Sequence, residues 1–253
     1  GERATLPDSA GEFADLGRAL ETMRERLEGK QYVERYVHAL THELKAPLAA
    51  VRGASELLES PLPDADRARF ATSVREQSER MAQMIDKLLA LAAVEHRQRI
   101  EQPADIDVRT LIDAAVAPFA DRGVQLRVDA GDASGLHIRG DAFLLRQLLS
   151  NLVDNACDFS PADGVVDVTA RSDGAQLRIV VADRGPGVPA YALPRVFERF
   201  FSLPRPGGRS RSSGLGLAFA AEVATLHGGA VRLAQRDGGG TCAIVELPLS
   251  ATG

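Results

Sequence analysis

Residues 33–58, VERYVHALTHELKAPLAAVRGASELL, contain a seam, which is a row of apolar residues spaced alternately four and three positions apart, from Val33 to Leu58. This spacing predicts a helix with one continuous apolar seam. A second seam with the same spacing runs from Phe70 to Leu91. Between the two, Ser60-Pro-Leu-Pro-Asp64 contains two prolines, which end a helix and force an extended backbone. We therefore predict two long helices that a short turn joins into an antiparallel hairpin.

A lone hairpin of this kind leaves an apolar stripe uncovered. Two copies packed together would bury the stripe in a homodimeric four-helix bundle, which the sustained seam favours. The alternative is that the stripe packs on the rest of the same chain. A shorter heptad-like pattern over residues 12–30 predicts a further helix before the hairpin.

Composition excludes several classes of protein. The chain has 253 residues, of which 45% are hydrophobic and 26% charged, and this balance argues against disorder. Its net charge of −5 argues against a general nucleic-acid binder. No uncharged apolar run approaches the roughly 18 residues of a membrane span. The two cysteines, Cys157 and Cys242, form no CxxC motif, so a reducing compartment is expected.

The pattern changes near residue 103, where strand and helix signals begin to mix. Helices are expected at about 107–120, 141–159 and 215–226, and strands at about 124–128, 166–170, 177–181, 230–235 and 241–247. We predict an α/β sandwich in this half, with a sheet on one side and helices on the other.

His42 is the first candidate for chemistry. It lies about 200° around the helix from Leu40, so it faces away from the seam. Glu43 is adjacent, and Pro47 removes a helical hydrogen bond to the carbonyl of Glu43. A neutral imidazole is a nucleophile, and a carboxylate can hold or take the proton of its other nitrogen. Taken alone, these residues fit an ordinary surface histidine better than a nucleophile.

The run from His42 to Leu48, His-Glu-Leu-Lys-Ala-Pro-Leu, resembles the H box of two-component sensor histidine kinases. The resemblance implies that His42 accepts a phosphoryl group and that Glu43 orients or deprotonates it. Relatives of this type often carry Thr or Asn four residues after the histidine, where this chain has Ala46. We therefore expect weak phosphatase activity toward the partner regulator.

Asn151 and Asn155 are four positions apart on an expected helix, so their amides lie on one face. The segment 151–156, Asn-Leu-Val-Asp-Asn-Ala, resembles the N box of the same family. This implies that Asn155 coordinates Mg²⁺ and that Asn151 reaches the nucleotide phosphates. Amide oxygens suit a Mg²⁺ ion that a triphosphate already neutralises.

Asp158 departs from the family pattern, which often has a basic residue at this position. It lies seven residues after Asn151, on the same helix face. A carboxylate cannot pair with phosphate, so one charge contact is missing or comes from elsewhere. Arg205, Arg209 and Arg211 are candidates to supply it, and a merely solvated basic loop is the alternative.

The segment 183–187, Asp-Arg-Gly-Pro-Gly, follows an expected strand and resembles the G1 box. There the aspartate, here Asp183, accepts a hydrogen bond from the adenine amino group. Gly185 and Gly187 let the backbone pass close to the ligand and hinge a mobile loop.

The segment 197–201, Phe-Glu-Arg-Phe-Phe, resembles the F box. By that resemblance Phe200 packs in or under the nucleotide lid, and Arg199 contacts the phosphates or the phosphorylated histidine. Plain core packing of the phenylalanines is the alternative, and both can hold together.

The segment 213–217, Ser-Gly-Leu-Gly-Leu, opens a helix and resembles the G2 box. Gly214, Leu215 and Gly216 would then offer backbone N–H groups to phosphate oxygens at a helix N-terminus. Arg211 joins them in the expected ATP site. The stretch 191–205, together with 212–219, resembles the CreC-type sensor kinases in particular.

Five motifs in the family's order imply a bacterial sensor histidine kinase. The expected domains are the end of a HAMP-like linker helix (1–30), a dimerisation and phosphotransfer hairpin (31–99) and an ATP-binding domain of the GHKL type (103–250). The implied cofactors are ATP and Mg²⁺. The implied activity is autophosphorylation of His42, followed by phosphoryl transfer to an aspartate of a response regulator.

The implied partners are a second copy of the chain and a response-regulator receiver domain, with no nucleic acid. The chain would be the cytoplasmic portion of an inner-membrane protein, attached to the membrane only through absent upstream segments. Two alternatives stay open: a catalytically degenerate relative that serves as a partner-binding module, and an ATPase or serine-directed kinase on the same ATP-binding fold.

Overall fold

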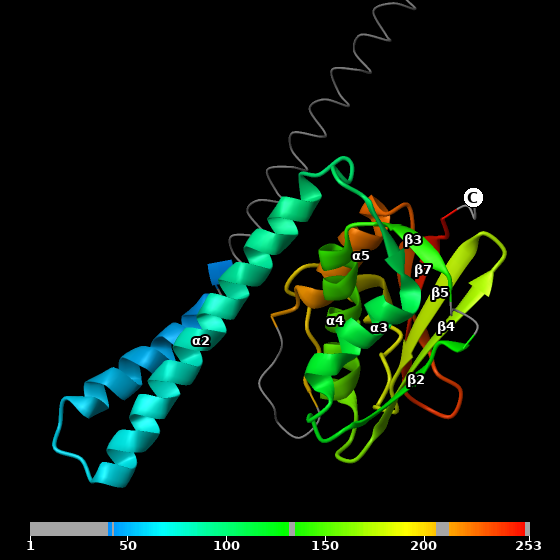
Figure 1. The fold of residues 1–253 in the computed structure, drawn as a ribbon. Coiled ribbons are helices and arrows are strands. Elements are labelled where there is room, and N and C mark those ends of the chain that lie inside the picture. Colours follow the sequence, from blue (N-terminus) through cyan, green and yellow to red (C-terminus); the bar gives the residue numbers. More distant parts are fainter. Residues whose placement is uncertain (1–39, 42, 132–134, 206–212, 251–253) are drawn as a thin grey trace, which may run out of the picture. The chain divides into compact units, whose positions relative to one another are not determined.

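The computed structural model describes residues 40–41, 43–131, 135–205 and 213–250 (Figure 1). The chain divides into two compact units, residues 1–78 and 79–253. His42, Arg209, Arg211 and the helix expected over residues 12–30 lie outside the described residues. The domain bounds 1–30, 31–99 and 103–250 stay predictions.

The helical hairpin is confirmed. Residues 43–58 are helical, and α2 covers Asp64–Glu95 after a turn that contains both prolines. The first helix continues through Pro47, whose side chain is buried. Two other features fit the sequence pattern: Ala54 on the first seam is buried, and α2 starts with Asp64 and Asp66, whose charges complement the helix dipole.

The second unit contains a five-stranded sheet with the order β2-β4-β5-β7-β6. Its strands are β2 (Gln125–Asp129), β4 (Val165–Asp173), β5 (Gln176–Ala182), β6 (Ala230–Gln235) and β7 (Thr241–Pro248). Strands β2 and β4 are parallel, and the other pairs are antiparallel.

Three helices cover one face of this sheet (Figure 1): α3 (Val108–Val116), α4 (Ala142–Phe159) and α5 (Gly216–Leu226). Alternate residues of β4 and β5, such as Val166 and Ile179, are fully buried and form the sheet's share of the core. The predicted α/β sandwich is thereby confirmed.

Local signals explain where the helices begin and end. The Asp107 side chain accepts the Thr110 N–H at 2.7 Å and caps α3, and Asp141 accepts the N–H groups of Phe143 and Leu144 and caps α4. Helix α5 ends where the Gly229 N–H donates to the carbonyl of Ala224 at 2.8 Å.

A second, two-stranded sheet was not predicted from the sequence. Strand β1 (Ala104–Asp107) pairs antiparallel with β3 (His137–Gly140). Each strand has four residues, too few for an alternating pattern to stand out. Two single 3-10 turns, η1 (Ala117–Phe119) and η3 (Leu193–Arg195), complete the described elements. Of the described helices, none combines the length and the apolar character that crossing a bilayer requires.

Candidate functional site

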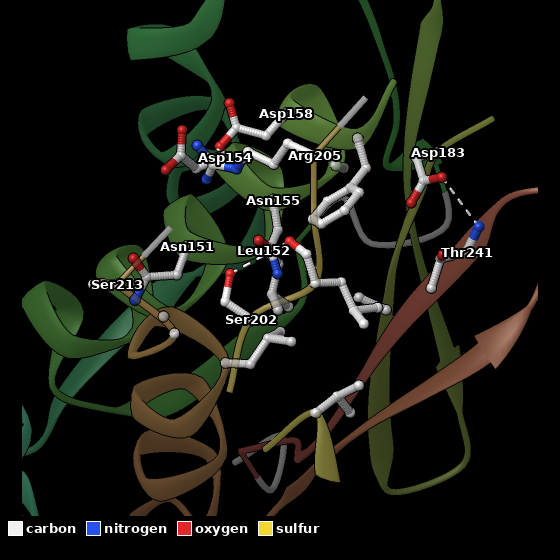
Figure 2. A pocket seen from close by; sticks show the side chains of 18 of the residues that line it. Asn151, Leu152, Asp154, Asn155, Asp158, Asp183, Ser202, Arg205, Ser213 and Thr241 are labelled. Atoms are coloured by element: carbon white, nitrogen blue, oxygen red, sulfur yellow. Dashed lines mark hydrogen bonds and ion pairs between the residues drawn. The ribbon is translucent and has the colours of Figure 1, made fainter. Parts of the chain in front are cut away.

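A pocket of about 400 Å³ lies in the second unit, among α4, the start of α5 and the adjoining ends of β5 and β7 (Figure 2). Six of the residues that the N, G1 and G2 motifs assign to the ATP site line it: Asn151, Asn155, Asp183, Gly187, Gly214 and Gly216. These residues come from three segments that are far apart in the chain. The fold therefore gathers the N, G1 and G2 motifs around one cavity.

Helix α4 presents its amides to this pocket. Asn151 and Asn155 are half-buried, one turn apart on the face that lines the cavity. A Cβ atom added at Gly216 would lie 3.7 Å from the Cβ of Asn151, so α5 begins in van der Waals contact with this face. The first N–H groups of α5, which have no partner within the helix, therefore start beside the amides.

Asp183 faces them from the sheet side of the pocket (Figure 2). Its Oδ1 accepts the N–H of Gly185 at 2.8 Å and the N–H of Thr241 at 3.1 Å. The residue is only 6% exposed, and this burial raises the pKa of the carboxyl, while the two backbone bonds oppose the rise. Because both bonds use Oδ1, Oδ2 is the oxygen that can accept an N–H from a ligand.

Gly185 contributes through this bond and does not line the pocket itself. A Cβ atom there would meet the carbonyl oxygen of Phe159 at 2.4 Å. The turn after β5 can therefore approach the end of α4 only with glycine at this position.

The F and G2 motifs are joined to each other. Phe200 has a positive φ of 61°, and its N–H donates to the carbonyl of Gly214 at 2.9 Å. Gly214 has a φ of 65°, and a Cβ atom there would meet the backbone of Phe200 at 2.5 Å. The next residue, Phe201, lines the pocket in place of Phe200. Leu215 is buried in the core, so only its backbone is available to a ligand.

Arg199 does not belong to the pocket wall. Its guanidinium pairs with Glu95, and burial lowers its pKa, while the nearby Glu222 opposes that shift. The phosphate contact expected of Arg199 therefore stays a prediction.

Three arginines do line the pocket: Arg80, Arg122 and Arg205. Arg205 forms an ion pair with Asp158, and Arg122 forms one with Asp154. The sequence pattern pointed to Arg205 but not to Arg122, which lies in an irregular segment outside every motif.

The donor set suits Mg²⁺ bound together with phosphate. No cluster of three or more His, Cys, Asp or Glu side chains within the described ranges could hold a metal ion alone. Mg²⁺ keeps several waters and is usually held by one or two protein oxygens plus substrate phosphates. One amide oxygen, from Asn155, fits that demand.

Glu43 lies on the hairpin helix of the first unit and is partly exposed.

Family models match both halves of the chain. Residues 32–97 match the "His Kinase A (phospho-acceptor) domain", and residues 140–251 match the "Histidine kinase-, DNA gyrase B-, and HSP90-like ATPase" model.

Individual relatives agree with these matches. The sensor protein CreC of Escherichia coli K12 is 43% identical over 247 residues, which are 96% of this chain and 51% of CreC. The chain spans about half the length of the curated relatives it matches. Among solved structures, the mycobacterial sensor histidine kinase MprB is 30% identical with a TM-score of 0.51, over 59% of this chain and 99% of that one. Full-length ShkA in complex with AMPPNP is 27% identical with a TM-score of 0.61, over 87% of this chain and 46% of ShkA.

Proposed function

The chain belongs to the sensor histidine kinases, and from that premise we propose that it binds Mg²⁺-ATP in the α4–α5 pocket and phosphorylates its own His42. The main observation behind the proposal is that Asp183 faces Asn151 and Asn155 across one shared cavity. An acceptor for adenine and ligands for phosphate and metal then stand on opposite walls.

Asp183 selects the base. The amino group of adenine donates to Oδ2, while the N–H groups of Gly185 and Thr241 hold Oδ1 in place. Guanine carries a carbonyl oxygen where adenine has its amino group, and that oxygen cannot donate to a carboxylate.

Asn151, Asn155 and the start of α5 hold the triphosphate. Asn155 supplies an amide oxygen to Mg²⁺, and Asn151 donates to phosphate oxygens. The backbone N–H groups near Gly214 and Gly216 add donors at a helix N-terminus. Mg²⁺, when bound, neutralises charge on the phosphates.

The proposed reaction moves one phosphoryl group. An imidazole nitrogen of His42 forms a bond to the γ-phosphorus as the bond to the β–γ bridging oxygen breaks, and ADP leaves. Glu43 holds or takes the proton of the other imidazole nitrogen. An aspartate of a response-regulator receiver domain then accepts the phosphoryl group from His42.

We also propose that the hairpin pairs with a second copy. Ile85 and Leu89 lie one turn apart on α2 and keep 48% and 65% of their surface exposed in the single chain. A four-helix bundle would cover such side chains. Since the chain spans half of its relatives, we place it as the cytoplasmic region of a longer membrane-bound sensor.

The test is autophosphorylation with γ-labelled Mg²⁺-ATP. Wild type should take up acid-labile label, as phosphohistidine does, and His42→Ala and Asn155→Ala should take up none. His96→Ala removes an exposed histidine outside the proposed site and should label like wild type. Acid-stable label that survives His42→Ala would indicate a serine-directed kinase. ATP binding without label on any variant would favour the degenerate, partner-binding alternative.

A further inference from the structure

Four charged side chains meet at the wall of the pocket: Asp154 and Asp158 from α4, and Arg122 and Arg205 from two other segments. Asp154 and Asp158 are one turn apart and both contact Arg122, to Asp158 at 3.9 Å. Asp158 also pairs with Arg205, which Figure 2 shows reaching the turn of α4 that carries it. All four line the pocket. The network thus joins α4 to the segment before β2 and to the segment that follows the F motif.

The central carboxylate of the network is deeply placed. The side chain of Asp158 is 8% exposed and that of Arg205 is 16% exposed. A carboxylate at this depth is costly unless cations and hydrogen bonds compensate its charge. It also stands one turn after Asn155, in a cavity proposed to hold a polyanion. Left unpaired, Asp158 would repel phosphate.

The arginines change the effect of this carboxylate. A guanidinium presents five N–H donors in a rigid fork, so binding one carboxylate does not exhaust it. A carboxylate that binds some of these N–H groups also fixes the orientation of the guanidinium. Asp158 therefore holds a cation at the turn of α4 next to Asn155.

We propose that Arg205 contacts the nucleotide phosphates and that Asp158 is the positioning residue that holds it there. The inference rests on the proposed function, since it requires a nucleotide in this pocket. Where the family often has a basic side chain on α4, this chain would then have a carboxylate that holds an arginine from another segment.

The direction in which one substitution changes the affinity for ATP distinguishes this proposal from simple repulsion. If Asp158 acts only through its negative charge, Asp158→Asn should tighten ATP binding. If Asp158 positions Arg205, the same variant should weaken it, because the guanidinium loses its anchor. The two effects have opposite directions in one measurement.

The experiment compares the binding of Mg²⁺-ATP and of adenosine by calorimetry. Arg205→Ala should weaken ATP binding by about 10- to 100-fold, the value of a charge-assisted hydrogen bond. Adenosine binding should not change, which also shows that the pocket is folded. Asp158→Asn should weaken ATP binding by about 5-fold or more and raise KM for ATP with little change in kcat. The double variant Arg205→Ala/Asp158→Arg places a cation on α4 directly and should regain most of the lost ATP affinity.

The matched control is Arg178→Ala, which breaks an exposed arginine–carboxylate pair with Glu246 on the sheet and should leave ATP binding unchanged. Unchanged ATP affinity in Arg205→Ala, or tighter binding in Asp158→Asn, would overturn the inference and leave the proposed function standing. Failure of the wild-type chain to bind ATP would overturn both.

Discussion

The backbone N–H of Thr241, at the start of β7, donates to Oδ1 of Asp183 at 3.1 Å across 58 positions of sequence. Strand β7 lies beside β5 in the sheet, so the fold itself holds the carboxylate in place. The orientation of Asp183 in the pocket is thus fixed before a ligand arrives.

Asp183→Asn should abolish most ATP binding without harming the fold. The asparagine Oδ1 can keep both backbone bonds, and its NH₂ group then faces the adenine amino group, donor against donor. We expect a loss of about 10- to 100-fold in ATP affinity, because a buried donor is left unsatisfied. Isothermal titration calorimetry measures it, with Asp173→Asn in the β4–β5 hairpin as the control. Unchanged affinity would contradict the assigned role.

Asp183→Asn should also change how the stability of the protein depends on pH. Burial raises the pKa of Asp183 above its ordinary 3.8, so its contribution to stability is present below pH 3.8 and lost as pH rises through the folded pKa. At neutral pH the ionised carboxylate therefore lowers the free energy of unfolding. Asp183→Asn should melt at least as high as wild type at pH 7, and the two should converge in acid. Thermal unfolding across pH measures this, and a variant that is less stable at pH 7 would refute it.

Gly214→Ala should lower both stability and ATP affinity. The left-handed backbone costs a non-glycine residue about 1–2 kcal/mol, and here a Cβ atom would also meet the backbone of Phe200. Gly174→Ala is a matched control, since Gly174 has a φ of 62° but open space around it. That variant should lose stability from strain alone and bind ATP normally. Equal effects of the two substitutions would show that the contact with Phe200 is unimportant.

His227 should make the ATP-binding domain sensitive to acid. Its Nδ1 donates to the carbonyl of Val223 at 2.7 Å, and its Nε2 accepts the N–H of Asp141 at 3.0 Å, which requires a neutral ring. Burial lowers the pKa of His227, while the bond to the Val223 carbonyl and the nearby Asp141 oppose this. The stability it contributes is therefore present above its ordinary pKa of 6.5 and lost as pH falls through the folded pKa.

His227→Gln should unfold more easily at pH 7, by about 1–3 kcal/mol, because a buried partner is removed. It should also lose part of the wild-type fall in stability between pH 7 and pH 5. Denaturant unfolding at several pH values measures both effects. A variant with the full wild-type slope would assign the acid sensitivity to other groups.

Leu89→Glu should dissociate the proposed dimer. Leu89 is 65% exposed in the single chain, so a charge there costs a monomer little, whereas a buried charge in a four-helix bundle costs much more. Sedimentation or light scattering should show a shift from dimer to monomer. Glu76→Ala changes α2 about 180° around the helix from Ile85 and should stay dimeric. A Leu89→Glu chain that remains dimeric would place the interface elsewhere.

Ala46→Thr should increase phosphatase activity. Ala46 is exposed and carries no polar group that could orient a water molecule. The wild-type chain should therefore remove phosphate only slowly from a receiver domain that it has phosphorylated. The decay of labelled receiver domain with and without each kinase variant tests this, and rapid decay with wild type would contradict it.

Periodicity and helix capping, both local properties of the sequence, determine most of the fold. The seams from Val33 to Leu58 and from Phe70 to Leu91 predict the hairpin, and Asp107 and Asp141 mark helix starts that the structure confirms. Each of these signals needs only neighbours within a turn or a strand. The four-residue strands β1 and β3 give no such signal, because their pairing joins residues 30 to 36 positions apart.

The identity of the candidate site residues is likewise local, whereas their chemical setting is not. Motif spacing identifies Asn151, Asn155 and Asp183, but only the sheet register brings Thr241 to the aspartate. The tertiary structure alone places Arg199 outside the pocket wall and draws Arg205 to Asp158. A charged side chain bonds to whatever opposite charge the tertiary packing brings near, and sequence spacing does not encode that distance.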